Sequence, residues 1–241
     1  MALVYAHRGG AALRPENSIA AFDHGMALGA DGLEFDVHLS SDGVVVVHHD
    51  ATLERTTRGK GRVANHTATE LAALGVPLFA EVLERYRDAS FIVELKVDSI
   101  HLVRQVVYEL RAAGAIERTS LGCFDSRPLE AARKLEPALR TGSSKQETRW
   151  AVYRSWIGLP MRAAVGYREF QVPERSGITP IVTRRFLSQA RRAGLAVKVW
   201  TVNEPADMRR LVEWGVDALI TDRPDLAVPI VRSLNPVDPR R

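Results

Sequence analysis

Cysteine is nearly absent from this chain of 241 residues, since Cys123 is the only one. A single thiol excludes an intrachain disulfide and gives no sign of an oxidising compartment. It also excludes a cysteine cluster of the kind that binds zinc. We therefore expect Cys123 to be a small buried residue.

Long hydrophobic runs are lacking as well. The longest apolar stretches, such as those at 44–47 and 195–200, fall far short of the roughly 20 residues that a membrane-spanning helix needs. The chain does not open with a basic segment followed by an apolar one, because it enters LVYAHRGG at residue 3, which has the pattern of a strand leading into a functional loop. We expect a cytoplasmic protein with no transmembrane segment.

A strong charge of one sign is missing too. The 33 basic residues nearly balance the 29 acidic ones, and the net charge of +4 is interspersed along the chain rather than gathered into a basic stripe. This pattern argues against a nucleic-acid partner and indicates solubility with a slight preference for anionic small molecules. The 46% apolar and 26% charged residues are typical of an ordinary globular protein.

No long linker rich in Pro, Gly or Ser divides the chain, and short apolar runs alternate with segments of helical periodicity. Strands are predicted at 3–7, 32–38, 91–96, 119–124, 139–143, 168–172, 196–201 and 218–221. Helices are predicted at 17–29, 101–114, 127–136, 146–157, 183–193 and 205–214. Eight strands separated largely by helices predict a single (β/α)8 TIM barrel of the α/β class.

Two segments depart from this alternation. An extra strand at 44–49 follows the Asp-Gly turn signal of SSDG at 40–43, so we expect it to pair antiparallel near the barrel mouth. The polar, turn-rich stretch at about 51–77 predicts a small insertion over the same end of the barrel. The barrel domain is expected to span 1–232, with a loose C-terminal tail at 233–241.

Carboxylates recur at the strand ends, where active sites of such barrels lie. Glu34 and Asp36 are spaced by two and therefore project to one side of a strand, and Glu94 and Lys96 repeat this spacing. Taken alone, the pair at 34 and 36 is also compatible with an exposed strand face. Converging carboxylates would repel one another, and a hard divalent cation, Mg²⁺ or Ca²⁺, is the usual remedy. The sequence therefore predicts one metal site with Glu34, Asp36 and Glu94.

Cations and histidines accompany these carboxylates. Arg8 and Lys96 add positive charge suited to a phosphate anion. His7 and His49 have the pKa range needed to exchange protons with attacking and departing oxygens. A metal, fixed cations and paired histidines together predict phosphodiester cleavage.

The order of these motifs resembles the glycerophosphodiester phosphodiesterase family. The matching segments are HRGGAALRPENS at 7–18, GLEFDVHLSSDGVVVVHHD at 32–50, TLERTT at 52–57, ELK at 94–96, WTVNEP at 200–205 and GVDALITDRPD at 215–225. They occupy most of 3–98 and 178–226. Their joint order and spacing are far more specific than any single short motif.

The resemblance implies a role for each matching residue. The general acid and base would be His7 and His49, the metal ligands Glu34, Asp36 and Glu94, the phosphate contacts Arg8 and Lys96, and the aromatic wall Trp200. On an otherwise apolar strand, Trp200 could instead simply fill the barrel core. Ser18 and Cys123 are conservative departures from the family pattern, whereas His48 doubles the catalytic histidine and leaves open which imidazole reacts.

Glu16 and Asn17 match the PEN segment of the family, which would help to shape the mouth of the site. The same segment also opens a helix, and either Asn17 or Ser18 is a plausible N-cap. Capping alone would explain part of this motif.

The implied activity is metal-dependent hydrolysis of a small glycerophosphodiester to glycerol 3-phosphate and an alcohol, in lipid or glycerol metabolism. One alternative is a lysophospholipase D or sphingomyelinase D-like activity, which requires a place for an acyl chain. The apolar, aromatic and basic segment at 150–167 raises this alternative, although an ordinary barrel helix explains it equally well. A second alternative is a barrel that binds phosphodiesters without catalysis.

Overall fold

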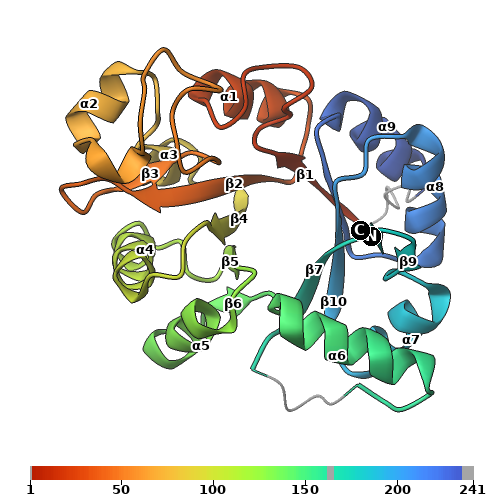
Figure 1. Ribbon diagram of the computed structural model, residues 1–241. Helices are drawn as coiled ribbons and strands as arrows, with labels where there is room; N and C mark the ends of the chain where they lie inside the picture. The colour runs from red at the N-terminus through yellow and green to blue at the C-terminus, as the bar shows by residue number, and fades with distance from the viewer. Residues whose placement is uncertain (1, 162–165, 235–241) are drawn as a thin grey trace.

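The structure, a computed structural model, describes residues 2–161 and 166–234 and forms a nearly closed barrel of eight parallel strands (Figure 1). The barrel strands are β1 (Leu3–His7), β2 (Gly32–Leu39), β4 (Ser90–Leu95), β5 (Thr119–Gly122), β6 (Arg140–Thr141), β7 (Glu169–Pro173), β10 (Ala196–Trp200) and β11 (Ala218–Thr221). They neighbour one another in the order β6-β5-β4-β2-β1-β11-β10-β7. Among the described residues, an isolated bridge between Gly142 and Glu169 joins β6 to β7, the two ends of this order. The predicted (β/α)8 barrel is confirmed.

Helices surround the strands in Figure 1. They are α1 (Ile19–Ala27), α2 (Ala68–Ala73), α3 (Phe79–Arg85), α4 (Ile100–Ala112), α5 (Ser126–Leu135), α6 (Lys145–Trp156), α7 (Arg184–Arg192), α8 (Pro205–Trp214) and α9 (Pro224–Leu234). The six predicted helices are confirmed. The predicted helices did not include α2, α3 and α9. For α3, the N-cap Leu78 offers no side-chain hydrogen bond, so no capping residue marked its start.

Apolar side chains on the outer face of the strands pack against these helices. Phe35 of β2 lies at the centre of one cluster, with its ring centroid 5.6 Å from those of both Phe22 and Phe91. Phe170 and Phe186, 4.9 Å apart, anchor a second cluster between β7 and α7. Because this packing takes alternate residues of each strand, the remaining residues turn into the barrel. Cys123 is buried, as expected.

The extra strand β3 (Val45–Val47) pairs antiparallel with β2, as predicted. The turn-rich segment after it contains a 3₁₀ turn, η1 (Val63–Asn65), and α2, which opens with a capping box between Thr67 and Glu70. These elements bury a small apolar cluster of their own around Leu53 and Leu71. They lie at one side of the barrel, next to β2 and α3 (Figure 1).

Two features near the C-terminal half were not predicted. A short hairpin, β8 (Arg175–Ser176) and β9 (Thr179–Pro180), follows β7. At the end of the chain, α9 continues through Ser233 and Leu234 and so enters the expected tail, whose residues 235–241 lie outside the described residues. Within the described ranges, the helices are all too short or too polar to cross a bilayer.

Candidate active site

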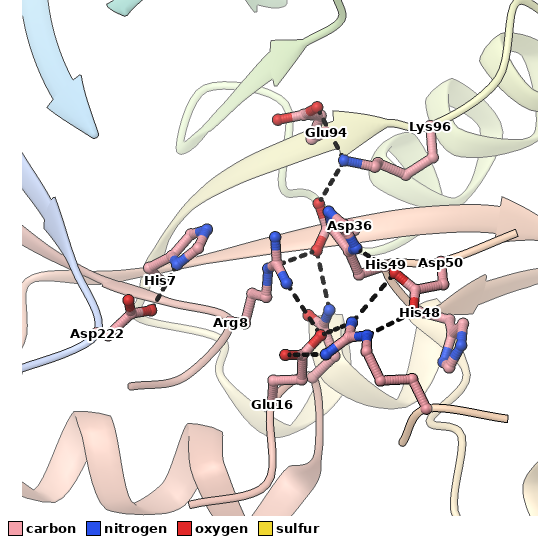
Figure 2. A network of polar contacts seen from close by, with 12 residues as sticks. His7, Arg8, Glu16, Asp36, His48, His49, Asp50, Glu94, Lys96 and Asp222 are labelled. Carbon is pink, nitrogen blue, oxygen red and sulfur yellow. Dashed lines mark hydrogen bonds and ion pairs between the residues drawn. The ribbon is translucent and has the colours of Figure 1, made fainter. Parts of the chain in front are cut away.

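A cavity of about 1080 Å³ lies at the carboxyl ends of the barrel strands. It brings together the seven charged and imidazole side chains that the sequence singled out, here called the charged wall: His7, Arg8, Glu34, Asp36, His49, Glu94 and Lys96. Figure 2 shows most of these side chains converging from β1, β2, β4 and the loop after β3. Trp200, the eighth predicted residue, also lines this cavity.

The three carboxylates meet because of the strand register. Leu33 and Phe35 are buried in the outer apolar cluster, which turns Glu34 and Asp36 into the barrel. Asp36 lies directly opposite Glu94 in the parallel pairing of β2 with β4. One oxygen from each of the three carboxylates lies within 4.8 Å of the others. The group therefore has the composition and spacing to hold one cation through oxygen ligands.

The electrostatics of this carboxylate group also fit a cation. Burial, together with the nearby carboxylates of Asp36 and Glu94, raises the pKa of Glu34 to about 8. The Lys96 ammonium lies 3.3 Å from Asp36 Oδ1 and 3.1 Å from Glu94 Oε1. Lysine thus offsets part of the negative charge, but Glu34 remains a buried carboxyl group that added positive charge would stabilise in its ionised form.

The loop after β1 is held tightly beneath the carboxylates. Gly9 has φ +86°, and a Cβ atom there would lie 2.7 Å from Ala21, so only glycine fits this turn. The turn leaves the Arg8 amide to donate a hydrogen bond to Glu34 Oε2 at 3.2 Å. Arg8 Nε lies 3.3 Å from Asp36 Oδ2, which places the guanidinium beside the cluster.

Asn17 and Ser18 divide the two roles that the sequence suggested for this segment. Ser18 is the N-cap of α1, since its hydroxyl accepts a hydrogen bond from Ala21 N. Asn17 instead is buried, with a left-handed φ of 53°, and its Nδ2 donates a 2.9 Å hydrogen bond to Asp36 Oδ2. Asn17 therefore orients a carboxylate of the cavity and does not cap the helix.

His7 is fixed by a carboxylate from the far end of the chain. Its Nδ1 donates to Asp222 Oδ1 at 2.6 Å, and Asn203 Nδ2 donates to Asp222 Oδ2 at 2.8 Å. The His7 Nε2 atom lies 3.7 Å from Glu34 Oε2, on the cavity side. Burial alone would lower the pKa of His7, but the carboxylates of Glu34 and Asp222 outweigh it and raise this pKa.

His49 has a similar arrangement with different support. Its Nδ1 donates to Asp50 Oδ1 at 2.6 Å, and Arg55 of the insertion donates to both oxygens of Asp50. Arg55 also donates to Glu16, at 2.9 Å and 2.7 Å, and Glu16 accepts from Arg8 at 3.0 Å. Hydrogen bonds from Arg55 hold the pKa of Asp50 well below its usual range, against a smaller opposing effect of burial.

His48 and His49 point in different directions. His48 is buried, and its Nε2 donates to the Thr52 carbonyl at 3.0 Å, away from the cavity (Figure 2). His38 Nε2 donates to the His49 carbonyl at 3.1 Å and so helps to place that residue. Only His49 of these three lines the cavity.

Aromatic side chains line another part of the cavity, beside polar residues of α6 such as Gln146 and Arg149. Trp200 and Phe124 are in edge contact, with ring centroids 6.3 Å apart. Trp150, Tyr153 and Trp156 of α6 also line the cavity, and these three residues are called the aromatic wall below. Trp200 is half-buried, contacts the small apolar cluster inside the barrel and lines the cavity.

Several residues of the site received no role in the sequence interpretation. No role was assigned from the sequence to Asp222, Asn203, Asp50 or Arg55. A signal existed for Asp222 and Asp50, because each is an acidic residue at the carboxyl end of a strand, where barrel sites form. Their pairing with particular histidines requires the structure.

Comparison with known proteins agrees with this geometry. A model of the family described as "Glycerophosphoryl diester phosphodiesterase family" matches residues 7–226. A glycerophosphodiester phosphodiesterase of Caldanaerobacter subterraneus is 31% identical, covering 95% of this chain and 98% of that protein. The crystal structure of a glycerophosphodiester phosphodiesterase from Agrobacterium tumefaciens superposes with a TM-score of 0.78 at 28% identity, covering 95% of this chain and 100% of the other.

A more distant structure, at 23% identity, comes from Oleispira antarctica and is a phosphodiesterase in complex with the product sn-glycerol-3-phosphate. It superposes with a TM-score of 0.76 and covers 95% of this chain and 96% of its own. At that identity the likeness shows a shared fold alone.

Proposed function

Because this chain belongs to the glycerophosphoryl diester phosphodiesterase family, we propose that it hydrolyses small glycerophosphodiesters to glycerol 3-phosphate and an alcohol. The observation that carries this proposal is the charged wall: three carboxylates within 4.8 Å of one another, two cations and two carboxylate-paired histidines share one cavity. A barrel that only bound phosphodiesters would not need two oriented imidazoles.

In this proposal, Glu34, Asp36 and Glu94 hold one divalent cation, either Mg²⁺ or Ca²⁺. The donor set supports a hard ion, because it offers carboxylate oxygens and the described residues place no thiol among them. When bound, the cation supplies a Lewis acid for the phosphoryl oxygens. Arg8 and Lys96, which border the same carboxylates, would contact the phosphate and its developing negative charge.

The two histidines move the protons. In each, the Nδ1–H is engaged by a carboxylate, so Nε2 is the nitrogen that faces the reaction. One imidazole accepts the proton of the attacking water or substrate hydroxyl, and the other donates a proton to the leaving alcohol. Asp222 and Asp50 fix the tautomer and ring orientation, and they stabilise each imidazolium when it forms.

The product seen with the Oleispira antarctica phosphodiesterase is consistent with this reaction. We further propose that the chain acts on small molecules of lipid and glycerol metabolism in the cytoplasm. Trp200 and Phe124, which are in edge contact in the cavity lining, would pack against the carbon skeleton of the substrate.

The proposal is tested with metal-stripped protein and glycerophosphocholine. We expect no turnover until Mg²⁺ or Ca²⁺ is restored. The products should then be equal amounts of glycerol 3-phosphate, measured by phosphorus NMR, and choline, measured by a choline assay. Glycerophosphoethanolamine and glycerophosphoglycerol, run in parallel, rank the head groups. Full activity in the presence of a chelator would contradict the metal dependence. Release of phosphocholine would show that a different phosphoester bond is cleaved.

A further inference from the structure

Two cations of α6 line the cavity at a distance from the charged wall. They are Lys145 and Arg149, which lie one turn apart on the helix. Helix α6 connects β6 to β7, the two ends of the strand order, whereas β2 and β1 stand at its middle. In a ring of eight strands the ends of this order face its middle, so α6 lies across the barrel from Glu34 and Asp36 of β2 (Figure 1). The cavity therefore carries fixed positive charge on two opposite sides.

Neither of these two cations has an acidic partner among the residues that the structure describes. Glu147, the acidic residue of α6, is engaged elsewhere, because it forms the capping box with Ser144 and pairs with Arg133 at 2.9 Å. Like charges four residues apart on a helix repel one another and destabilise it. An anion bound between Lys145 and Arg149 would remove this repulsion.

Exposed cations often remain simply hydrated, but the third basic residue of α6 differs from the other two. Arg154 does not line the cavity, and its guanidinium donates to the Pro160 carbonyl at 3.1 Å and 2.9 Å. Within the described part of the chain, the basic residues of α6 that lack a partner are thus the two that line the cavity. The hydroxyl groups of Ser143 and Thr148, 2.8 Å apart, line it beside them and offer neutral donors.

The charge and size of the cavity indicate which anion would bind at α6. The phosphodiester that reacts is assigned to the charged wall, beside Arg8 and Lys96, so it does not account for the cations on the other side. Two positive charges match a phosphate monoester, which carries about −1.5 to −2 charges at pH 7 and which arginine can bind through two parallel hydrogen bonds. At about 1080 Å³, the cavity lies at the upper end of the range for ligand pockets, roughly 300–1,000 Å³. It has room for a substrate with a phosphate at each end.

We propose that Lys145 and Arg149 form a second phosphate subsite, so that the preferred substrates are glycerophosphodiesters whose alcohol part carries a phosphate monoester of its own. This inference rests on the proposed function, because the bond cleaved and the charged wall are the same. The segment 145–149 lies between the segments 3–98 and 178–226, through which the chain resembles its family, so the resemblance does not imply this subsite. The diester would lie at the carboxylates and the monoester at α6.

The first test compares two substrates that differ by one phosphate. Glycerophosphoinositol and glycerophosphoinositol 4-phosphate are assayed at low ionic strength with metal in excess. We expect kcat/KM to be about ten- to a hundredfold higher for the phosphorylated substrate, the factor that two charge-assisted contacts would give at a partly exposed site. Equal or lower values for this substrate, with glycerophosphoinositol still hydrolysed, overturn the subsite and leave the proposed function standing.

The second test locates the subsite. Lys145→Gln and Arg149→Gln should each lower the ratio of kcat/KM for the phosphorylated substrate to that for glycerophosphoinositol by about three- to tenfold. Lys134→Gln and Arg104→Gln are the matched controls, because they remove the same charges from exposed positions of α5 and α4 that do not line the cavity. An unchanged ratio in the α6 variants, or an equal fall in the controls, contradicts this placement.

A binding measurement separates the two proposals if turnover fails. Inositol 4-phosphate, the alcohol that such a substrate would release, is titrated against metal-free protein and followed by phosphorus NMR. A change in its chemical shift that is lost in the double variant Lys145→Gln/Arg149→Gln supports the subsite even when no glycerophosphodiester is hydrolysed. No change with the wild-type protein, or the same affinity in the double variant, overturns it.

Discussion

The charged wall and the aromatic wall of the cavity are held in different ways. In the charged wall, side chains are tied by partners: Asp36, with 2% of its side chain exposed, is contacted by Asn17, Arg8 and Lys96. In the aromatic wall, Trp150 is 61% exposed. Proton transfer and charge stabilisation require fixed geometry, whereas apolar binding depends mainly on the area buried. We therefore expect changes in the charged wall to affect every substrate and changes in the aromatic wall to affect substrate choice.

The largest effects should come from the two histidines of the charged wall. His7→Ala and His49→Ala should each lower kcat/KM for glycerophosphocholine by about 10²–10⁴-fold or more, because each removes a proton-transfer group. His48→Ala is the matched control, since His48 is buried and donates to the Thr52 carbonyl away from the cavity. Steady-state kinetics with metal in excess measures all three. An inactive His48→Ala protein together with an active His49→Ala protein would assign the proton-transfer role to His48 instead.

The next effect should come from a metal ligand. Glu34→Gln should lower metal affinity and turnover together, by about tenfold or more, because an amide oxygen replaces a carboxylate. Folding should survive, since the change removes a buried ionisable group whose pKa is raised to about 8. Titration calorimetry gives the affinity and thermal unfolding the stability. Lost activity with unchanged metal affinity contradicts the ligand role.

The aspartates behind the histidines should have smaller effects. Asp222→Asn and Asp50→Asn should each lower kcat by about 10–100-fold with little change in KM, because each loosens the orientation of an imidazole that remains present. Asp217→Asn is the control, since Asp217 accepts a hydrogen bond from Val197 N and does not line the cavity. A change confined to KM would assign Asp222 or Asp50 to substrate binding instead.

The smallest effect concerns stability at the edge of the charged wall, where the side chain of Arg55 is 49% exposed. Arg55 holds the pKa of Asp50 below its ordinary value, so this pair stabilises the fold above the unfolded pKa of about 3.9 and loses that contribution as the pH falls. Arg55→Ala should lower the free energy of unfolding by about 0.5–1 kcal/mol at pH 7, after allowing for solvent screening, and by less at pH 3.

Urea unfolding at the two pH values measures this difference. Arg58→Ala, an exposed arginine of the same insertion, controls for the loss of positive charge. A cost that stays constant with pH would mean that Arg55 acts through packing rather than through its ion pairs.

The two walls also differ in how far the sequence predicts them. The charged wall can be predicted from charged residues at strand ends and from carboxylates two residues apart, since Glu34 and Asp36 must share one side of β2. The partner of His7 does not follow, because Asp222 lies 215 residues away and meets it only through the pairing of β1 with β11. Local patterns carry no information on such a contact.

The aromatic wall lies at 150–156, between the two matching segments at 3–98 and 178–226. Helical periodicity predicts α6, but it does not reveal which side of the helix faces the barrel. Aromatic residues spaced by three usually indicate a core-facing side. Here the small residues Ala151, Val152 and Ser155 take the core and leave the aromatic side to the cavity, a choice set by tertiary packing.

The division of acid and base roles between His7 and His49 is tested most directly with a nitrophenyl ester of glycerol phosphate. Nitrophenolate leaves without protonation, so only the variant that lacks the general acid should recover, to near the wild-type kcat/KM. The variant lacking the base should remain about 10²–10⁴-fold impaired on this substrate, as on glycerophosphocholine. Equal impairment of His7→Ala and His49→Ala on the nitrophenyl ester would contradict the division of labour between the two imidazoles.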